Sequence, residues 1–126
     1  VDCTSGPYIR ALARDLGRAL GVGGHLTMLR RTRIGSFDVT AAASVDDVAE
    51  DALIAPATAA AVVVGALAVG ADEARDLRHG KRIDGGGRLT GAVAAAIDPD
   101  GRLVGIVERR GTQLKSVMNM PEEAAR

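Results

Sequence analysis

Apolar and polar positions alternate along residues 1–5, VDCTS, and this period of two predicts a half-buried strand. From Tyr8 to Leu20 the apolar side chains recur at intervals of three and four residues, which predicts an amphipathic helix. Ser5 stands where it could cap that helix, and Pro7 stands near its first turn. The chain is therefore expected to open with a strand followed by a helix.

Glycines at 21, 23 and 24 are expected to end this helix, and the stretch that follows, residues 25–34, reads as a second strand. Residues 44–53 have Ser44 ahead of several acidic side chains, as at the start of a short capped helix. Residues 54–60 have the composition of a linker. We place a domain boundary near residue 57, which divides the chain into 1–57 and 58–126.

The second part of the chain is dominated by strand patterns. Residues 61–69 are expected to form a strand, 71–80 a short helix ended by glycine, and 82–91 a glycine-rich loop. Residues 92–109 are expected to form two strands joined by an Asp-Pro-Asp-Gly turn, 112–120 a last strand, and 121–126 a loose tail. The fold class is therefore α+β, with a small β-rich barrel as the second part.

Composition changes this picture little, but charge changes it more. Only 2% of the 126 residues are aromatic against 47% hydrophobic, so the core must consist of aliphatic side chains. The net charge is zero, yet residues 1–39 carry +3, residues 40–76 carry −6 and residues 77–126 carry +3. Because salt screens exposed charges over roughly 8–10 Å, the two basic ends can each attract a polyanion.

Several familiar sites are excluded by their spacing. The glycines of GVGG at 21–24 lack the third glycine of a dinucleotide-binding loop, since Leu26 stands there. Gly80-Lys81 lacks both the upstream glycine and the following Ser or Thr of a phosphate-binding loop. One cysteine and two histidines favour neither a disulfide nor a metal site. Cys3 with His25 is conceivable as a nucleophile pair, but a lone cysteine in a strand is more typical of a core.

Basic residues mark the candidate chemistry. Arg10, Arg14 and Arg18 recur every fourth residue, and the last two are expected on a solvated helix face. Arg10 differs, because a cation in the first turn of a helix is electrostatically unfavourable unless a carboxylate pairs with it. No acidic side chain lies within one turn of it, so the partner must come from another segment.

Two more basic groups suggest contacts with phosphate. Arg30, Arg31 and Arg33 fall within four residues, although an ordinary basic surface strand stays a possible reading. The segment VERRGTQLK repeats the pattern with Arg109, Arg110 and Lys115.

The segment VDCTSGPYIRALARDLGRALGVGGHLTMLRRTRIGSF closely resembles the TruB-type tRNA pseudouridine synthases. That family runs through Tyr-Ile-Arg, a helix with Asp-Leu-Gly, then Leu-Gly, Gly-Ala-His and Leu-Arg-Arg. The 19-residue offset between Arg10 and Leu29 matches it, while Pro7 and Gly24 stand where Thr and Ala are common. LRHGKRI, GRLVGIVER and LKSVMNM more weakly resemble the family's PUA-like RNA-binding domain.

The resemblance implies isomerisation of uridine 55 in the T-loop of tRNA to pseudouridine, without metal or organic cofactor. It implies that Tyr8 stacks on the flipped base, that Arg10 pairs with the catalytic aspartate, and that Leu29 packs near the base, although plain core packing explains Leu29 equally well. The basic residues would contact RNA: Arg30, Arg31, Arg33, Lys81, Arg109, Arg110 and Lys115.

The nucleophilic aspartate of the family lies in a Gly-Thr-Leu-Asp-Pro segment, which residues 1–126 do not contain. Neither IDPDG at 97–101 nor GADEA at 70–74 replaces it. We expect residues 1–57 to be the end of the family's mixed-sheet catalytic domain and residues 58–126 to be the PUA-like domain. Without that aspartate, we expect the chain alone to be inactive. The complete protein is expected to be a cytoplasmic monomer that binds the tRNA T-arm.

Two alternatives remain at this stage. The chain could be a non-catalytic RNA-binding module, which would bind T-arm RNA in a salt-dependent way without isomerising it. It could also be an α+β domain with two basic patches and no preference for folded RNA.

Overall fold

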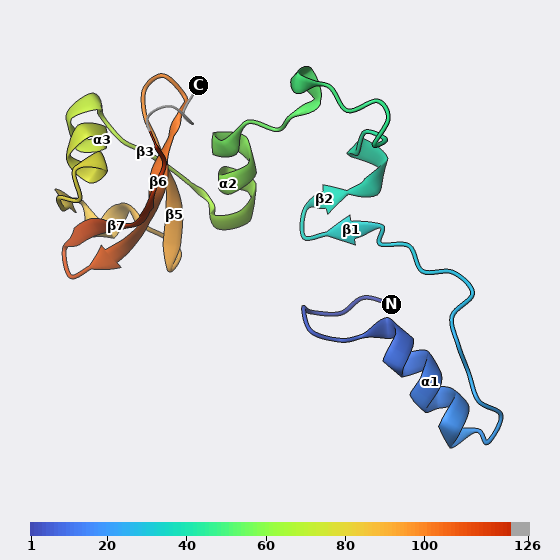
Figure 1. Cartoon of the computed structure of the whole chain (residues 1–126). Helices are drawn as coiled ribbons and strands as arrows, with labels where there is room; N and C mark the ends of the chain where they lie inside the picture. Colours follow the sequence, from blue (N-terminus) through green and yellow to red (C-terminus); the bar gives the residue numbers. More distant parts are fainter. Residues whose placement is uncertain (122–126) are drawn as a thin grey trace. The chain divides into compact units, whose positions relative to one another are not determined.

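A computed structural model of the chain describes residues 1–121 (Figure 1). It divides into two compact units, Val1–Ile34 and Gly35–Arg126. Each unit is described by itself.

The first unit is built on one helix, α1 (Ile9–Ala19). Its bounds agree within one residue with the expected helix, because the three-and-four spacing of apolar side chains is strong here. The expected capping was wrong: Tyr8 is the N-cap residue, and no side chain caps the helix. The expected strand at residues 1–5 was also wrong, since those residues form no ladder and Cys3 is exposed.

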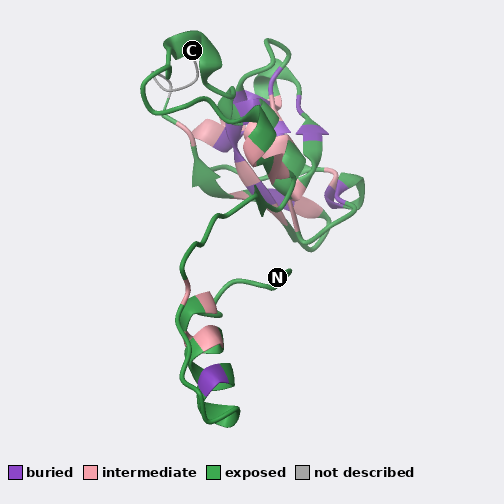
Figure 2. Cartoon of the chain, turned by 90° about the vertical axis from the view of Figure 1, so that its right-hand side faces the viewer, coloured by how far each residue is buried: buried purple, intermediate pink, exposed green. Residues whose placement is uncertain are grey.

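The apolar stripe of α1 is not covered by the rest of its own unit. Leu12, Leu16 and Leu20 are 55%, 60% and 67% exposed. Figure 2 shows a single buried residue on this helix, which is Gly17. The helix is therefore specified by its sequence pattern and not by burial within residues 1–34.

Residues 25–53 contain much less regular structure than expected. The predicted strand at 25–34 is reduced to β1 (Arg33–Ile34), and β2 (Phe37–Asp38) and a 3-10 turn (Val39–Ala41) follow it. The predicted helix at 44–53 is wrong, because only Glu50–Ala52 form a 3-10 turn.

The cap expected at Ser44 forms, but no α-helix follows it. Ser44 Oγ donates to the Asp47 carboxylate at 2.6 Å and accepts the Asp47 N–H at 3.2 Å, which is the bond that an N-cap residue makes to the third residue of a helix. Val45 and Val48 are exposed, so burial of an apolar face does not stabilise a helix beyond this first turn.

The expected linker at 54–60 instead begins a helix, α2 (Pro56–Val64). Alanine is the best helix former and proline is tolerated in the first turn, so the run PATAAAVVV favours a helix over a linker or strand. Gly65, at φ +82°, ends it, and the strand expected over 61–69 is confined to β3 (Ala66–Ala68).

The centre of the second unit is a mixed five-stranded sheet in the order β3-β5-β6-β7-β4. β3 pairs with β5 in parallel, and all the other neighbours are antiparallel. The remaining strands are β4 (Ile83–Asp84), β5 (Val93–Ile97), β6 (Leu103–Arg110) and β7 (Gln113–Asn119). Because β3 and β4 lie at opposite ends of this order, the sheet is a half-barrel and not a closed barrel.

Most sequence expectations for this unit are confirmed. α3 (Ala71–Arg78) is the short helix expected before Gly80, and β5, β6 and β7 are the three expected strands. The glycine-rich stretch 82–91 is mainly loop, with β4 and a 3-10 turn (Gly86–Arg88) inside it. Of the expected loose tail, only Pro121 is among the described residues. The α+β class is therefore confirmed.

Two helices cover opposite faces of this sheet (Figure 1). The α3 side holds the larger apolar cluster, which includes Leu77, Val104, Val107 and Leu114, all with no exposed surface. The α2 side holds a smaller one, in which Ala57 packs with Ala95 and Leu103. Buried residues concentrate accordingly in the sheet of this unit (Figure 2).

A buried carboxylate closes the turn between β5 and β6. Asp98 Oδ1 accepts the N–H groups of Asp100 at 3.1 Å and Arg102 at 2.9 Å, and its Oδ2 pairs with Arg78 of α3 at 2.9 Å. Burial is the largest single influence and alone would raise the pKa of Asp98. The hydrogen bonds from Arg102, Arg78 and Asp100 together outweigh it and hold that pKa below its usual value.

Candidate functional site

The Tyr8–Arg10 segment lies at the start of α1 and is open to solvent. Tyr8 has extended backbone, at φ −93° and ψ 104°, and its side chain is 74% exposed. Tyr8, Arg10, Ala11 and Arg14 line an open hollow of about 410 Å³. The tyrosine thus lines a shallow, open hollow together with two arginines.

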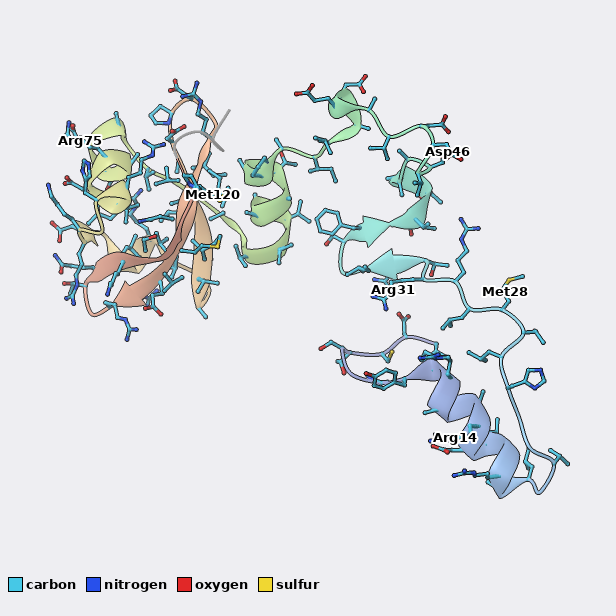
Figure 3. All side chains as sticks on the ribbon, in the orientation of Figure 1. Arg14, Met28, Arg31, Asp46, Arg75 and Met120 are labelled. Atoms are coloured by element: carbon cyan, nitrogen blue, oxygen red, sulfur yellow. The ribbon has the colours of Figure 1, made fainter. Side chains whose placement is uncertain are left out.

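Arg10 is exposed in the first turn, which contains no acidic residue. Within residues 1–121 no ion-pair partner is found for Arg10. Arg14 does have one: its Nε lies 2.8 Å from Asp15 Oδ1, and that hydrogen bond lowers the pKa of the Asp15 carboxyl. Arg14 and Arg18 are exposed as expected, and Figure 3 shows Arg14 on the helix surface. Arg10 therefore has its charge available for a carboxylate.

A close contact between glycines sets where the chain goes after α1. A Cβ on Gly17 would lie 2.2 Å from the carbonyl carbon of Gly23, and one on Gly24 would lie 2.6 Å from Ala13 O. The N–H groups of Val22 and Gly23 donate to Gly17 O at 3.1 and 3.0 Å. Only glycine allows the backbone to return this closely against the helix. The glycines thus position the start of the segment that leads to Leu29.

Arg30 and Arg31 of the basic segment lie outside any strand, whereas Arg33 lies in β1. Leu29 is 60% exposed, so it is not packed in a core of this unit. Arg30 and Arg31 are exposed, and Figure 3 shows Arg31 before β1. Arg33 is paired with Asp2, with Nη2 3.1 Å from Oδ1, which ties the basic segment to the residues ahead of α1.

The basic residues expected to bind RNA in the second unit differ in how they are engaged. Lys81 pairs with Asp76 at 2.8 Å, and this hydrogen bond lowers the pKa of Asp76. Arg110 pairs with Glu108 at 2.7 Å.

The other two expected contacts in this unit contrast with each other. Arg109 donates to the Leu89 carbonyl. Lys115 is exposed, and within residues 1–121 it has no ion-pair partner. Of the four expected contacts, Lys115 is therefore the one that makes neither an ion pair nor a side-chain hydrogen bond within residues 1–121.

Sequence reasoning missed one basic residue as a candidate. Arg82 precedes β4, is exposed and has no ion-pair partner within residues 1–121. The sequence signal that could have identified Arg82 is its position directly before Ile83, a buried β-branched residue, because neighbouring residues on a strand face opposite sides. Asp98, in the segment IDPDG, has a structural role: its carboxylate accepts the N–H groups of Asp100 and Arg102.

Within residues 1–121 no cluster of three His, Cys, Asp or Glu side chains could hold a metal ion. Over the same residues no helix has the length and apolar character that crossing a membrane requires.

Two models of the C-terminal region of one protein family match this chain. Residues 10–69 match the family model described as the tRNA pseudouridylate synthase B C-terminal domain. Residues 65–121 match the one described as tRNA pseudouridine synthase II, C terminal. Together the two matches run through both units. The chain belongs to the TruB family.

Individual TruB relatives agree with this assignment. A tRNA pseudouridine synthase B of Leifsonia xyli is 46% identical over 126 residues, which cover 98% of this chain and 42% of the relative. That of Thermobifida fusca is 47% identical over 121 residues, with coverages of 94% and 40%. That of Streptomyces coelicolor is 45% identical over 119 residues, with coverages of 93% and 40%. The chain thus spans about two fifths of the length of these TruB relatives.

Proposed function

We propose that this chain supplies part of the active-site wall and an RNA-binding unit to a tRNA pseudouridine synthase. The reaction is the isomerisation of uridine 55 in the T-loop of tRNA. The support is the family membership together with the exposed Tyr8–Arg10 segment beside an open hollow. The complete protein would be a monomeric, cytoplasmic isomerase that needs no metal or organic cofactor.

Each residue has a defined role in this proposal. Tyr8 offers an exposed ring on which an extruded uracil can stack, and stacking tolerates any base because every base has a π-face. Arg10 donates to the nucleophilic aspartate and keeps it ionised and oriented, because a guanidinium beside a carboxylate lowers that carboxyl's pKa. Leu29 contacts the base from its apolar side.

The aspartate itself must come from a segment of the Gly-Thr-Leu-Asp-Pro type, which residues 1–126 do not contain. We therefore propose that the chain alone does not isomerise uridine and acts by itself as an RNA-binding module. In this scheme residues 1–57 belong to the catalytic domain and residues 58–126 to the PUA-like domain. The basic groups around Arg30, Arg31 and Arg33 contact the RNA backbone.

The experiment measures label release from C5 of the target uridine in a T-arm stem-loop. It compares this chain with a complete protein in which an upstream catalytic segment of a TruB relative precedes it. The complete protein should turn over and the chain alone should not. Without turnover by the complete protein, the proposed activity would be wrong.

Arg10→Ala in that complete protein tests the assigned role. We expect loss of turnover by at least about 100-fold with RNA affinity changed by less than about threefold, because the arginine acts on the aspartate and not on the backbone. Arg18→Ala is the matched control, since Arg18 is equally exposed two turns further along α1. Near-normal turnover of Arg10→Ala would contradict the role.

A further inference from the structure

The outer edge of the sheet brings two cations together that lie far apart in sequence. β4 pairs with β7 in the register Ile83 with Leu114 and Asp84 with Gln113. Ile83 and Leu114 are buried against α3, so their neighbours along each strand face the opposite side of the sheet. Arg82 comes directly before β4, and one further step in the same register would put it opposite Lys115.

The acidic groups around this position are already engaged. On the neighbouring strand β6, Glu108 lies opposite Lys115. The Glu108 carboxylate, however, accepts a hydrogen bond from Arg110 Nε at 2.8 Å. Asp84 accepts a hydrogen bond from Gln113 Nε2 at 3.2 Å. Across residues 1–121, neither Arg82 nor Lys115 has an ion-pair partner, and both are exposed.

Two like charges directly opposite each other on neighbouring strands repel. An anion between them removes this repulsion and accepts hydrogen bonds from both, with the arginine fork and the lysine ammonium supplying complementary donors. Lys81 and Arg110 are poorer donors to an external anion, because each must first leave its own carboxylate.

We propose that Arg82 and Lys115 form a phosphate-binding pair in the second unit, and that its ligand is a backbone phosphate of the RNA. This inference rests on the proposed function and narrows it. Two exposed cations that bind phosphate make no contact with the edges of the bases. The pair therefore contributes to the affinity for RNA and to the position of the RNA on the protein, but not to a preference for one RNA sequence. Lys81, Arg109 and Arg110, which the family resemblance also implied at the RNA, already make hydrogen bonds within the unit.

The test titrates a fluorescent T-arm stem-loop with the full 126-residue chain at several KCl concentrations. The variants are Arg82→Gln, Lys115→Gln and the double variant. Lys81→Gln and Arg75→Gln, alone and together, are matched controls, because they remove the same number of positive charges from the same unit and each of these residues is paired with an aspartate. Arg82→Lys keeps the charge, and thermal unfolding of each variant checks its fold.

We expect the double variant to bind the RNA at least about tenfold more weakly. The slope of the logarithm of the binding constant against the logarithm of the KCl concentration should become shallower by about two, because two phosphate contacts are lost. The matched controls should stay within about threefold of the wild type, and Arg82→Lys should keep most of the affinity. A separate arm adds a glutamate-rich peptide as competitor, which should displace the RNA only weakly.

Other outcomes overturn the inference. Equal weakening by the double variant and its controls would mean a general charge effect, and wild-type affinity of the double variant would mean that the pair is not used. Efficient displacement by the acidic peptide would exclude RNA phosphate as the specific ligand. If the wild-type chain did not bind, the inference would also fail, while the proposed function would still be decided by the isomerisation assay.

Discussion

Replacing Asp98 by asparagine removes a buried charge while keeping the shape of the side chain. In the structure the carboxylate accepts two backbone N–H groups through Oδ1 and pairs with Arg78 through Oδ2. Asparagine can still accept the two N–H groups, so the variant isolates the ion pair between α3 and the β5–β6 turn. Asp100→Asn is the control, because its side chain is 73% exposed and its contact with Arg102 is 4.0 Å long.

The expected loss follows from the burial of the two partners. A hydrogen bond to a charged group contributes about 1.5–3 kcal/mol, and removing one partner of a fully buried pair costs about 3–5 kcal/mol. The Arg78 side chain is 25% exposed and can turn to water, which favours the lower range. We therefore expect Asp98→Asn to lower the free energy of unfolding by about 2 kcal/mol and Asp100→Asn by less than about 0.5 kcal/mol.

Urea unfolding at 25 °C, followed by circular dichroism, measures both values at pH 7 and again at decreasing pH. Because the pKa of Asp98 is lower in the folded protein than in the unfolded chain, its contribution is complete above the unfolded pKa. It is lost as pH falls through the folded pKa, so wild type and Asp98→Asn should converge in acid. A difference below about 0.5 kcal/mol at pH 7, or one that is unchanged in acid, would refute the reasoning.

Two glycine substitutions test close backbone approaches. Gly105→Ala places a methyl group 2.1 Å from Met118 O across the β6–β7 ladder and should lower the free energy of unfolding by at least about 2 kcal/mol, measured by urea unfolding. Gly87→Ala, which meets nothing within 4 Å, should change it by less than about 0.5 kcal/mol, and equal losses would contradict this account. Gly17→Ala places its methyl group 2.2 Å from the Gly23 carbonyl carbon and should release residues 21–24 from α1, which limited proteolysis would detect as faster cleavage there. Unchanged cleavage would show that the loop does not depend on this contact.

The sequence specified those elements whose pattern and end signals agree. α1 follows from its apolar spacing, α3 from its short run before Gly80, and β5 and β6 from two apolar runs around an Asp-Pro-Asp-Gly turn. For α3, β5 and β6 the conformational preference of the local sequence and the packing in the core favour the same structure. For α1, whose apolar side chains are exposed, the preference of the local sequence is enough.

The errors occurred where one composition suits two structures. The run PATAAAVVV is compatible with a linker or a strand, and its identity as α2 depends on Ala57, Ala60 and Val64 finding apolar partners on the sheet. The segment at 25–34 reads as a strand in sequence, yet a strand needs a paired neighbour along its whole length, and only Arg33–Ile34 have one.

The sequence by itself determined the family and the residues of the Tyr8–Arg10 segment, because motif spacing is a property of the chain alone. Only the tertiary structure decided which basic side chains are free. Lys81, Arg110 and Lys115 look alike in sequence, but Asp76 and Glu108 neutralise the first two. The pairing of β4 with β7 brings Ile83 opposite Leu114, and so brings together the neighbourhoods of Arg82 and Lys115, which are more than thirty residues apart in the chain. Charge neutralisation acts through space over a few ångströms, so it depends on the fold and not on the order of residues.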